Sequence, residues 1–350
     1  MDASRITPLL AVLVCGCPSS HFPAPLAEEE TDSGSTTEAP APECNESAIA
    51  VSDCVERDRY ITDLTEIAAP RPPGDAHWQA VQDLGFDRLT ELGYEVELHQ
   101  YGTGINVIGT LAGTTLPNEV VLISAHYDHI ASCQGADDNA TGVAGALEIA
   151  RVLAGAEYER TVVIALWDQE EVGLIGSRSW ALRASQDSTN VIANFNFEMI
   201  GYTDTANNSQ SVPAGFDLLF PDAVAELVSD GYVGDFIAVV SDDLSETTVT
   251  NFASHGERVG LPVVRLPLAA ELKNSPLVAD LRRSDHASLW EFDYPAMMLT
   301  DTANFRNLAY HCVMGDDTID RLDHEFTEKV MRATAGAAVD TLGLVPPTGL

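Results

Sequence analysis

The stretch that decides the fold is Val120-Val-Leu-Ile-Ser-Ala-His126, an apolar run that ends on an imidazole. Short continuous apolar runs are typical of strands that are buried on both faces of a parallel sheet. Residues 161–167 and 191–197 form similar runs. Between the first two runs, residues 141–154 have the periodicity of an amphipathic helix, with Asp138 or Asn139 as its expected N-cap. The pattern therefore begins as strand, helix, strand.

The same alternation extends over most of the chain. We expect the other helices at 47–69, 77–92, 223–230, from about 246, and at 320–342, and the other strands at 94–101, 106–111, 236–240 and 295–300. This order predicts an α/β fold: one domain over 47–345 with a central mixed, mostly parallel sheet covered by helices on both faces. The pattern is weakest over 203–282, which we expect to border the pocket.

Acidic and imidazole side chains follow the predicted strands. His126 ends the first run, Glu170 and Glu171 come just after the second, and Glu198 comes just after the third. Ligands bind at the carboxyl ends of parallel strands, so these side chains are expected to share one site. The segment Gly135-Ala-Asp-Asp-Asn-Ala-Thr-Gly142 and the pair Tyr310-His311 complete the set.

This set suits metal-assisted hydrolysis of an amide. Two zinc ions can lower the pKa of a water molecule and polarise a carbonyl group. Imidazoles and carboxylates are suitable zinc ligands. A further carboxylic acid can move the proton of the water to the departing amine. The sequence offers five ligands and one such acid.

With these motifs, the chain resembles metallopeptidase family 28, the co-catalytic di-zinc aminopeptidases of the bacterial leucyl aminopeptidase type, over about residues 60–342. The resemblance implies a zinc-dependent exopeptidase fold, two Zn²⁺ per chain, and peptide substrates with a free N-terminus. It assigns these roles: zinc ligands His126, Glu198, Glu171 and His311; bridging ligand Asp137; general base Glu170; oxyanion support Tyr310; and Asp128 behind His126, with a cis peptide bond between Asp137 and Asp138.

Two features of the motifs carry their own expectations. Glu198 stands where the best-known aminopeptidases of the family have Asp, and we expect the longer side chain to bind metal as well. Ser284-Asp-His286 resembles a family motif at the pocket wall, but three consecutive residues cannot face one another as a catalytic triad. We therefore expect Asp285, like Asp138, to support the ligands from behind. His129, His255 and His324 are expected to be structural or exposed.

Three alternatives stay open from the sequence. A di-zinc carboxypeptidase or dipeptidase would need a cationic cluster facing the substrate, for which Arg282, Arg283 and Arg306 are candidates. A glutaminyl cyclase would use a single zinc ion. A metal-free, receptor-like scaffold should lack at least one ligand, and this chain has a candidate for each.

The charge limits the possible partners. The formal net charge is −36, and Lys273 and Lys329 are the only lysines. Such a surface repels nucleic acid and anionic lipid, so we expect neither as a partner. It is compatible with a salty medium, or with a solubility trait of the source organism. The oligomeric state stays open.

The N-terminal residues predict export. Residues 1–17 read as a signal peptide with a short apolar core, and Val14-Cys-Gly-Cys17 resembles a lipobox. The protein is thus expected to be an outer-membrane or periplasmic lipoprotein, or secreted; an uncleaved, cytosolic start is the alternative. Any membrane contact would come through a lipid anchor. Residues 18–46, rich in Pro, Ser, Thr and Glu, predict a disordered linker. Cys44 with Cys54, and Cys133 with Cys312, are either disulfides or free thiols.

Overall fold

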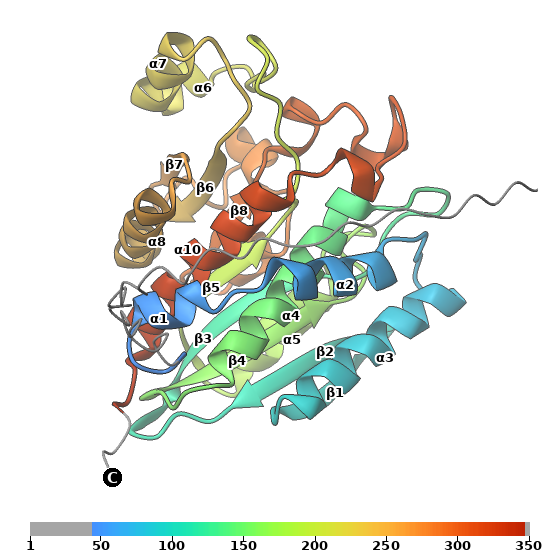
Figure 1. Cartoon of the computed structure of the whole chain (residues 1–350), viewed down its shortest axis with the longest axis vertical. Coiled ribbons are helices and arrows are strands. Elements are labelled where there is room, and N and C mark those ends of the chain that lie inside the picture. The colour runs from blue at the N-terminus through green and yellow to red at the C-terminus, as the bar shows by residue number, and fades with distance from the viewer. Residues whose placement is uncertain (1–43, 347–350) are drawn as a thin grey trace, which may run out of the picture. The chain divides into compact units, whose positions relative to one another are not determined.

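The computed structural model describes residues 44–346, so the predicted signal peptide and most of the predicted linker lie outside them. An eight-stranded sheet runs through these residues (Figure 1), in the order β1-β2-β4-β3-β5-β8-β6-β7. The strands are β1 Glu95–Tyr101, β2 Gly104–Leu111, β3 Leu116–His126, β4 Arg160–Trp167, β5 Asn190–Phe197, β6 Ile237–Asp242, β7 Val263–Leu268 and β8 Met297–Thr300.

The centre of the sheet is parallel. Strands β4, β3, β5 and β8 run in one direction, whereas β2 pairs antiparallel with β4 and β6 pairs antiparallel with β8. His126 lies opposite Trp167, and Ser124 lies opposite Asn196, so β3, β4 and β5 end at nearly the same level. The prediction of a mixed, mostly parallel sheet is confirmed, and three chain segments leave its carboxyl edge side by side.

Helices cover both faces of the sheet, as predicted. Figure 1 shows α1, α2 and α4 in front of the strands. On that face, Leu147 of α4 and Val330 of α10 share a core with Ile164, while Trp180 of α5 packs on the opposite face with Val163. The helices are α1 Ala48–Asp53, α2 Arg57–Ile67, α3 Ala76–Glu91, α4 Gly142–Leu153, α5 Ile175–Gln186, α6 Phe216–Leu219, α7 Pro221–Ser229, α8 Glu246–Val259, α9 His286–Trp290 and α10 His324–Leu342.

The double coverage explains why the strands read as unbroken apolar runs. Successive side chains of a strand point to opposite faces. In β4 the residues alternate between the two cores, with Val162, Ile164 and Leu166 in one and Val163, Ala165 and Trp167 in the other. A strand with one solvated face would alternate apolar with polar residues instead.

The N-terminal helical region differs from the prediction. The single helix expected over 47–69 is two helices, α1 and α2, which are separated at residues 54–56. Cys54 ends α1 and forms a disulfide with Cys44. The main-chain amide of Glu56 donates to the buried carboxylate of Glu148, 2.6 Å away. The disulfide and the hydrogen bond to Glu148 hold the chain at this break between the two helices.

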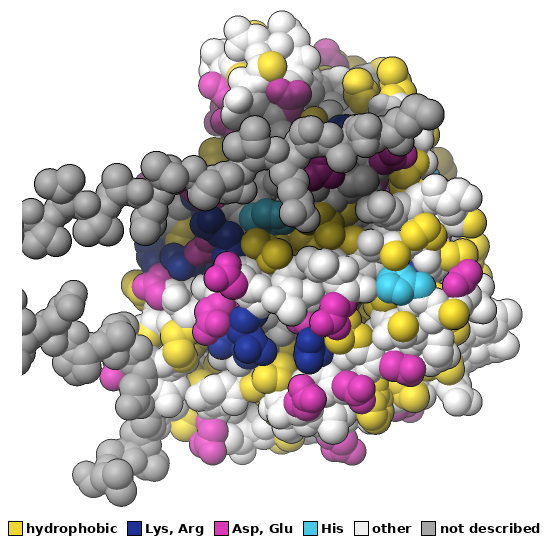
Figure 2. Space-filling view, turned by 45° about the vertical axis from the view of Figure 1, so that its right-hand side comes forward, with side chains coloured by type: hydrophobic (Ala, Val, Ile, Leu, Met, Phe, Trp, Pro, Cys, Tyr) yellow, Lys and Arg dark blue, Asp and Glu magenta, His cyan; other side chains and the backbone are white. Residues whose placement is uncertain are grey.

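Both cysteine pairs are disulfides. Cys44 is bonded to Cys54, and Cys133 is bonded to Cys312 across 179 residues of sequence. On the face drawn in Figure 2, acidic side chains are spread over the surface and basic ones gather in few places. Within residues 44–346, no helix has the length and apolar character needed to cross a membrane.

Candidate metal centre

The first cluster of potential ligands lies at the end of β3. The Nε2 atom of His126 is 3.4 Å from Oδ1 of Asp138 and 3.4 Å from Oε2 of Glu198. His126 ends β3, Glu198 follows β5, and Asp138 lies in the turn before α4. All three side chains are buried. Three separate segments thus bring three donor atoms to one point.

The second cluster shares one residue with the first. The Nε2 atom of His311 is 3.2 Å from Oδ2 of Asp138 and 3.1 Å from Oε2 of Glu171. Glu171 follows β4, and His311 lies on a turn after β8. The two oxygens of the Asp138 carboxylate therefore face different clusters, which is the arrangement of a bridging ligand.

The donor atoms fit zinc. Nε2 of His126, Oδ1 of Asp138 and Nε2 of His311 are buried, yet none has a hydrogen-bond partner within residues 44–346. Buried polar atoms rarely lack a partner. Tetrahedral zinc with bonds of about 2.0–2.1 Å separates its ligands by about 3.3 Å, close to the contacts described above. The residues therefore fit two zinc ions that share Asp138.

The electrostatics also favour bound cations. Asp138, Glu170, Glu171 and Glu198 place four carboxyl groups around two imidazoles. Burial opposes a charge on His311, but its contacts with Asp138 and Glu171 outweigh burial and raise its pKa to about 10. Such a concentration of buried negative charge is costly without compensating cations.

A third imidazole, that of His129, lies beside the second cluster. Donor atoms of His129, Asp138 and Glu171 lie within 4.8 Å of one another, so distance alone would allow His129 as a ligand. Its Nδ1 atom, however, is 2.7 Å from Oε1 of Glu171, which is a hydrogen bond and too short for two ligands of one metal. His311, at 3.1–3.2 Å from both carboxylates, fits the ligand position better. We interpret His129 as a buried support of Glu171.

Asp137, the predicted bridging ligand, lies elsewhere. Its Oδ1 atom accepts a hydrogen bond from the amide of Gly201, and its Oδ2 atom accepts one from Asn307, each at 3.0 Å. Asp138 adopts an extended backbone conformation (φ −101°, ψ 96°) inside the turn, and its side chain, not that of Asp137, reaches the two imidazoles. The geometry contradicts the prediction for Asp137 and for Asp138 as a support residue. The cis peptide bond is also one residue later than expected, between Asp138 and Asn139.

Glu170 lies beside the first cluster. Its carboxylate, the imidazole of His126 and the carboxylate of Glu198 have donor atoms within 4.8 Å of one another. Burial raises the pKa of Glu170 well above its usual range; His126 opposes this shift, and Glu198 adds to it. A carboxyl group that readily holds a proton next to the reacting centre is suited to general acid–base chemistry.

Asp128 supports both clusters. Its main-chain oxygen lies 3.1 Å from Nδ1 of His126, whereas its carboxylate is 3.7 Å from that nitrogen. The carboxylate accepts hydrogen bonds from the main-chain amides of Glu170 and Glu171, at 3.0 and 3.3 Å. Asp128 therefore orients His126 mainly through its backbone, and it holds the two glutamates through its side chain.

Comparison with known sequences finds a family that part of the chain resembles. Residues 106–228 match the sequence profile of peptidase family M28. The matched segment contains four of the proposed ligands: His126, Asp138, Glu171 and Glu198.

Relatives resemble this chain over part of their lengths. The "Uncharacterized protein YfbL" of Escherichia coli K12 is 33% identical over 226 residues, covering 61% of this chain and 64% of that protein. "Leucine aminopeptidase 1" of Ajellomyces dermatitidis is 27% identical over 255 residues, covering 69% of this chain and 57% of that protein. The chain thus spans less than two thirds of the length of these relatives.

Solved structures share the fold at low identity. LapA of Legionella pneumophila superposes with a TM-score of 0.66 at 17% identity and covers 85% of this chain and 76% of its own. A zinc aminopeptidase from Bacillus subtilis superposes with a TM-score of 0.60 at 13% identity. The match covers 83% of this chain and 96% of that protein. A glutaminyl cyclase from Porphyromonas gingivalis superposes with a TM-score of 0.58 at 18% identity. The match covers 83% of this chain and 99% of that protein. These likenesses support the zinc-dependent exopeptidase fold.

In the Ser284-Asp-His286 motif, it is the serine that contacts a proposed ligand. The hydroxyl of Ser284 donates to Oε2 of Glu198 at 2.7 Å. Asp285 is fully buried, burial raises its pKa to about 7, and its oxygens have no hydrogen-bond partner in the described part of the chain. Nε2 of His286 lies 2.9 Å from the main-chain oxygen of Leu281. Asp285 therefore makes no hydrogen bond to a proposed ligand within residues 44–346, but it lies close enough to interact with His126 and Glu198 through its charge.

An apolar cavity of about 80 Å³ adjoins the first cluster. Glu198, Tyr310 and Arg283 belong to its lining, and the ring of Tyr310 stacks on that of His311 with 3.9 Å between centroids. The cavity separates the sheet from α6 and α7, and most of its lining is apolar, including Phe216, Leu227, Phe236, Ala238, Leu266 and Met298. Several of these residues come from the weakly patterned region 203–282.

Two supporting residues escaped the sequence analysis. The fully buried guanidinium of Arg71 donates to main-chain oxygens of Tyr127, Gly135 and Asp138, at 2.9, 3.0 and 3.2 Å. Asp317 accepts hydrogen bonds from the main-chain amides of Asp137 and Asp138. The only sequence feature that could have indicated Arg71 is its place between prolines, in Pro70-Arg-Pro-Pro73. Nothing in the sequence around Asp317 distinguishes it from other acidic residues.

Proposed function

We propose that this chain is a di-zinc aminopeptidase of family M28 that removes N-terminal residues from peptides. The observation that carries the proposal is the carboxylate of Asp138, whose two oxygens face the otherwise unsatisfied Nε2 atoms of His126 and His311. Relatives named as leucine aminopeptidase and aminopeptidase support the choice of activity.

The residues divide into two metal positions. His126, Asp138 and Glu198 would hold the first ion, and Asp138, Glu171 and His311 would hold the second. Ions bound there would lower the pKa of a water molecule and polarise the scissile carbonyl. The hydroxyl of Ser284 fixes one oxygen of Glu198, and the imidazole of His129 fixes one oxygen of Glu171.

The proton transfers fall to Glu170. Its carboxylate takes a proton from the attacking water and delivers it to the nitrogen of the departing amine. Burial raises the pKa of Glu170 above its usual range, which favours its holding the proton between the two transfers. Tyr310, stacked on His311 in the wall of the cavity, supports the charge that develops on the carbonyl oxygen.

The charges around the cavity favour substrates with a free amino group. Glu170 and Glu198 offer negative charge where a substrate ammonium group would sit. Of the three candidate arginines, only Arg283 lines the cavity. Arg306 is buried against the main-chain oxygens of Tyr202 and Phe236, and Arg282 donates to that of Lys273. The described residues therefore provide no cationic cluster for a substrate carboxylate, which argues against a carboxypeptidase.

The cavity lining supports a preference for apolar N-terminal residues. Phe216, Phe236, Leu266 and Met298 surround a space beside Glu198 that a leucine or phenylalanine side chain would fill. The complete second position, with Glu171 and His311, favours hydrolysis over a cyclase with one zinc ion.

Export is part of the proposal. Both disulfides are typical of proteins that fold outside the reducing cytosol. Together with residues 1–17, they support a lipoprotein or a secreted enzyme, with contact to a membrane only through a lipid on Cys17.

The test is hydrolysis of a panel of aminoacyl chromogenic amides, each paired with its N-acetylated form. We expect cleavage of the free-amine substrates only. Glu170→Gln should lower kcat by about 10²–10⁴ while the zinc content stays at two per chain, because it removes the proton acceptor and no ligand. Glu246→Gln, an exposed change on α8, is the matched control.

The other outcomes separate the alternatives. Cleavage of acetylated substrates would transfer the assignment to a carboxypeptidase or amidase. A zinc-loaded protein that cleaves none of the panel would indicate another substrate class. A folded protein that binds no zinc would overturn the proposal.

A further inference from the structure

Among the proposed ligands, His311 has the weakest attachment to the fold. His126 ends β3, Glu198 directly follows β5, and Glu171 lies in the segment that leaves β4. Asp138 lies in the buried turn that leads into α4. His311 instead lies on a short turn beyond β8, and neighbouring side chains are largely exposed: Leu308 by 59%, Val313 by 76% and Met314 by 67%. The imidazole itself contacts the rings of Tyr310 and His129, but the exposed neighbours do little to hold the outer side of its turn.

The backbone of this turn is also unfavourable on its own. His311 and the following Cys312 both have left-handed dihedral angles, with φ of 54° and 55°. Residues with a side chain rarely adopt this region, and they stay there only where the surroundings hold them. Something outside the turn must therefore stabilise this conformation.

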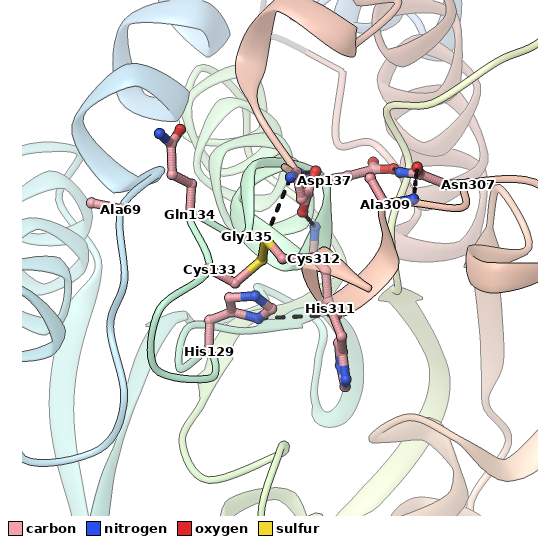
Figure 3. The surroundings of a disulfide bond; sticks show 12 residues. Ala69, His129, Cys133, Gln134, Gly135, Asp137, Asn307, Ala309, His311 and Cys312 are labelled. Atoms are coloured by element: carbon pink, nitrogen blue, oxygen red, sulfur yellow. Dashed lines mark hydrogen bonds and ion pairs between the residues drawn. A yellow bond between two sulfur atoms is a disulfide. The ribbon is translucent and has the colours of Figure 1, made fainter. Parts of the chain in front are cut away.

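The disulfide of Cys312 is the covalent attachment of the turn. It joins Cys312 to Cys133, whose Cα atom is 5.7 Å away and which is buried in the loop after β3. Figure 3 shows the disulfide between the loop that carries His129 and Gln134 and the turn that carries His311. The two loops belong to opposite halves of the chain, and each carries residues of the second cluster.

The partner loop is itself held rigidly. The guanidinium of Arg71 donates to the main-chain oxygens of Gln134, Gly135 and Asp138, at 2.8, 3.0 and 3.2 Å. The same buried cation thus fixes the residue next to Cys133 and the bridging ligand Asp138. The disulfide therefore attaches the turn of His311 to the loop of Cys133, which Arg71 holds in place together with Asp138.

We propose that the Cys133–Cys312 disulfide is the positioning element of the second metal position, holding His311 against Asp138 and Glu171, so that its reduction selectively weakens metal binding there. The first position, His126 with Asp138 and Glu198, has no residue on the tethered turn and keeps its affinity. This inference rests on the proposed two-metal function. Without the disulfide, zinc binding must itself order the left-handed turn, and the loss of conformational entropy lowers the affinity.

The experiment compares wild type with Cys133→Ala/Cys312→Ala. The matched control is Cys44→Ala/Cys54→Ala, which removes the disulfide next to α1. Zinc per chain is measured by mass spectrometry of the metal after dialysis against increasing chelator, and circular dichroism checks the fold. We expect two zinc ions in wild type and in the control. In the Cys133/Cys312 variant, the chelator concentration that removes the second zinc should fall at least tenfold, while that for the first stays unchanged.

The results separate the two proposals. Equal chelator midpoints for the second zinc in wild type and in the Cys133/Cys312 variant would overturn the positioning role. Wild type that never holds two zinc ions would overturn the two-metal function instead, and the inference with it. A matching loss in the Cys44/Cys54 control would show a general effect of disulfides on stability and would also overturn the positioning role.

A second measurement uses wild type alone and applies even where the variant does not fold. Binding linkage is reciprocal, so zinc at the second position must make the Cys133–Cys312 disulfide harder to reduce. For this two-electron couple, each tenfold change in zinc affinity corresponds to about 30 mV. Redox titration in glutathione buffers, with thiols alkylated and located by peptide mass spectrometry, should show that shift for Cys133–Cys312 and none for Cys44–Cys54. Identical potentials with and without zinc would overturn the inference.

Discussion

At the scale of single residues, the pair Asp137 and Asp138 shows how finely the site is specified. The two carboxylates are adjacent and both buried, yet one faces the imidazoles and the other faces Gly201 and Asn307. Burial raises the pKa of Asp137 well above its usual range, and Asp301 and Asp317 add to that shift. Asp137 therefore belongs to the hydrogen-bond network behind the site, and Asp138 is the carboxylate that faces the imidazoles.

This contrast gives a direct prediction for two matched variants. Asp138→Asn should lower kcat/KM by at least about 10³, because the several kcal/mol that the metal ions supply depends on both of its oxygens. Asp137→Asn should keep two zinc ions and most of the activity, at a cost of about 1 kcal/mol in the free energy of unfolding. Zinc analysis and peptide hydrolysis on both proteins check this. The opposite ranking would restore Asp137 as the bridging ligand.

Prediction from sequence succeeded for residues that follow strands. His126, Glu171 and Glu198 are brought together as expected, because the register of three parallel strands fixes their relative heights. In the turn before α4, the backbone dihedral angles decide whether Asp137 or Asp138 points toward the imidazoles. These angles cannot be predicted from the spacing of apolar residues in the sequence. Arg71 was missed for a related reason: it binds main-chain oxygens, and these leave no pattern in the side-chain sequence.

At the scale of helices and strands, the buried strands were the most predictable elements, and the cavity region was the least. Five strands, β1 to β5, lie close to their expected positions, because burial on a pleated sheet imposes a strong composition. Helix α5 and strand β7 were not predicted. Exposed and apolar residues mix in both, as in the alternately exposed and buried residues of β7. These elements are specified by tertiary contacts instead of local periodicity.

The elements around the cavity predict a change in substrate preference. Ala238 lies on β6 in the cavity wall, and Ala238→Leu would fill much of the space of about 80 Å³. We expect kcat/KM for a leucyl amide to fall by about 10–200-fold relative to an alanyl amide, the range for a misfit of a methylene or more. The ratio of the kcat/KM values for the two amides is its own control, because a general loss of folded enzyme lowers both values equally. An unchanged ratio would exclude this cavity as the binding site of the side chain.

At the scale of the whole molecule, the dominant property is charge. Asp and Glu number 54 against 18 Lys and Arg, and acidic side chains are spread over the face drawn in Figure 2. Long-range repulsion among exposed carboxylates opposes the compact state, and dissolved salt screens it. The composition thus predicts a protein that is more stable in salt than in dilute buffer.

We therefore expect the melting temperature to rise by at least about 3 °C between 0.05 and 1 M NaCl, which corresponds to about 2 kcal/mol for a chain of this size. Differential scanning calorimetry measures the change. Sucrose at equal osmolality is the control, because it stabilises by exclusion from the surface without screening charge. A rise in NaCl no larger than that in sucrose would contradict the role of repulsion.

The position of His311 in the chain has one more consequence. Ribosomes make the chain from the N-terminus, so residues 126–198 exist well before the turn that carries the last ligand. An unfinished or truncated chain can thus gather part of the constellation, but it cannot assemble the whole of it. For the peptidase proposed above, the complete set of metal ligands therefore exists only after residue 311 has been made.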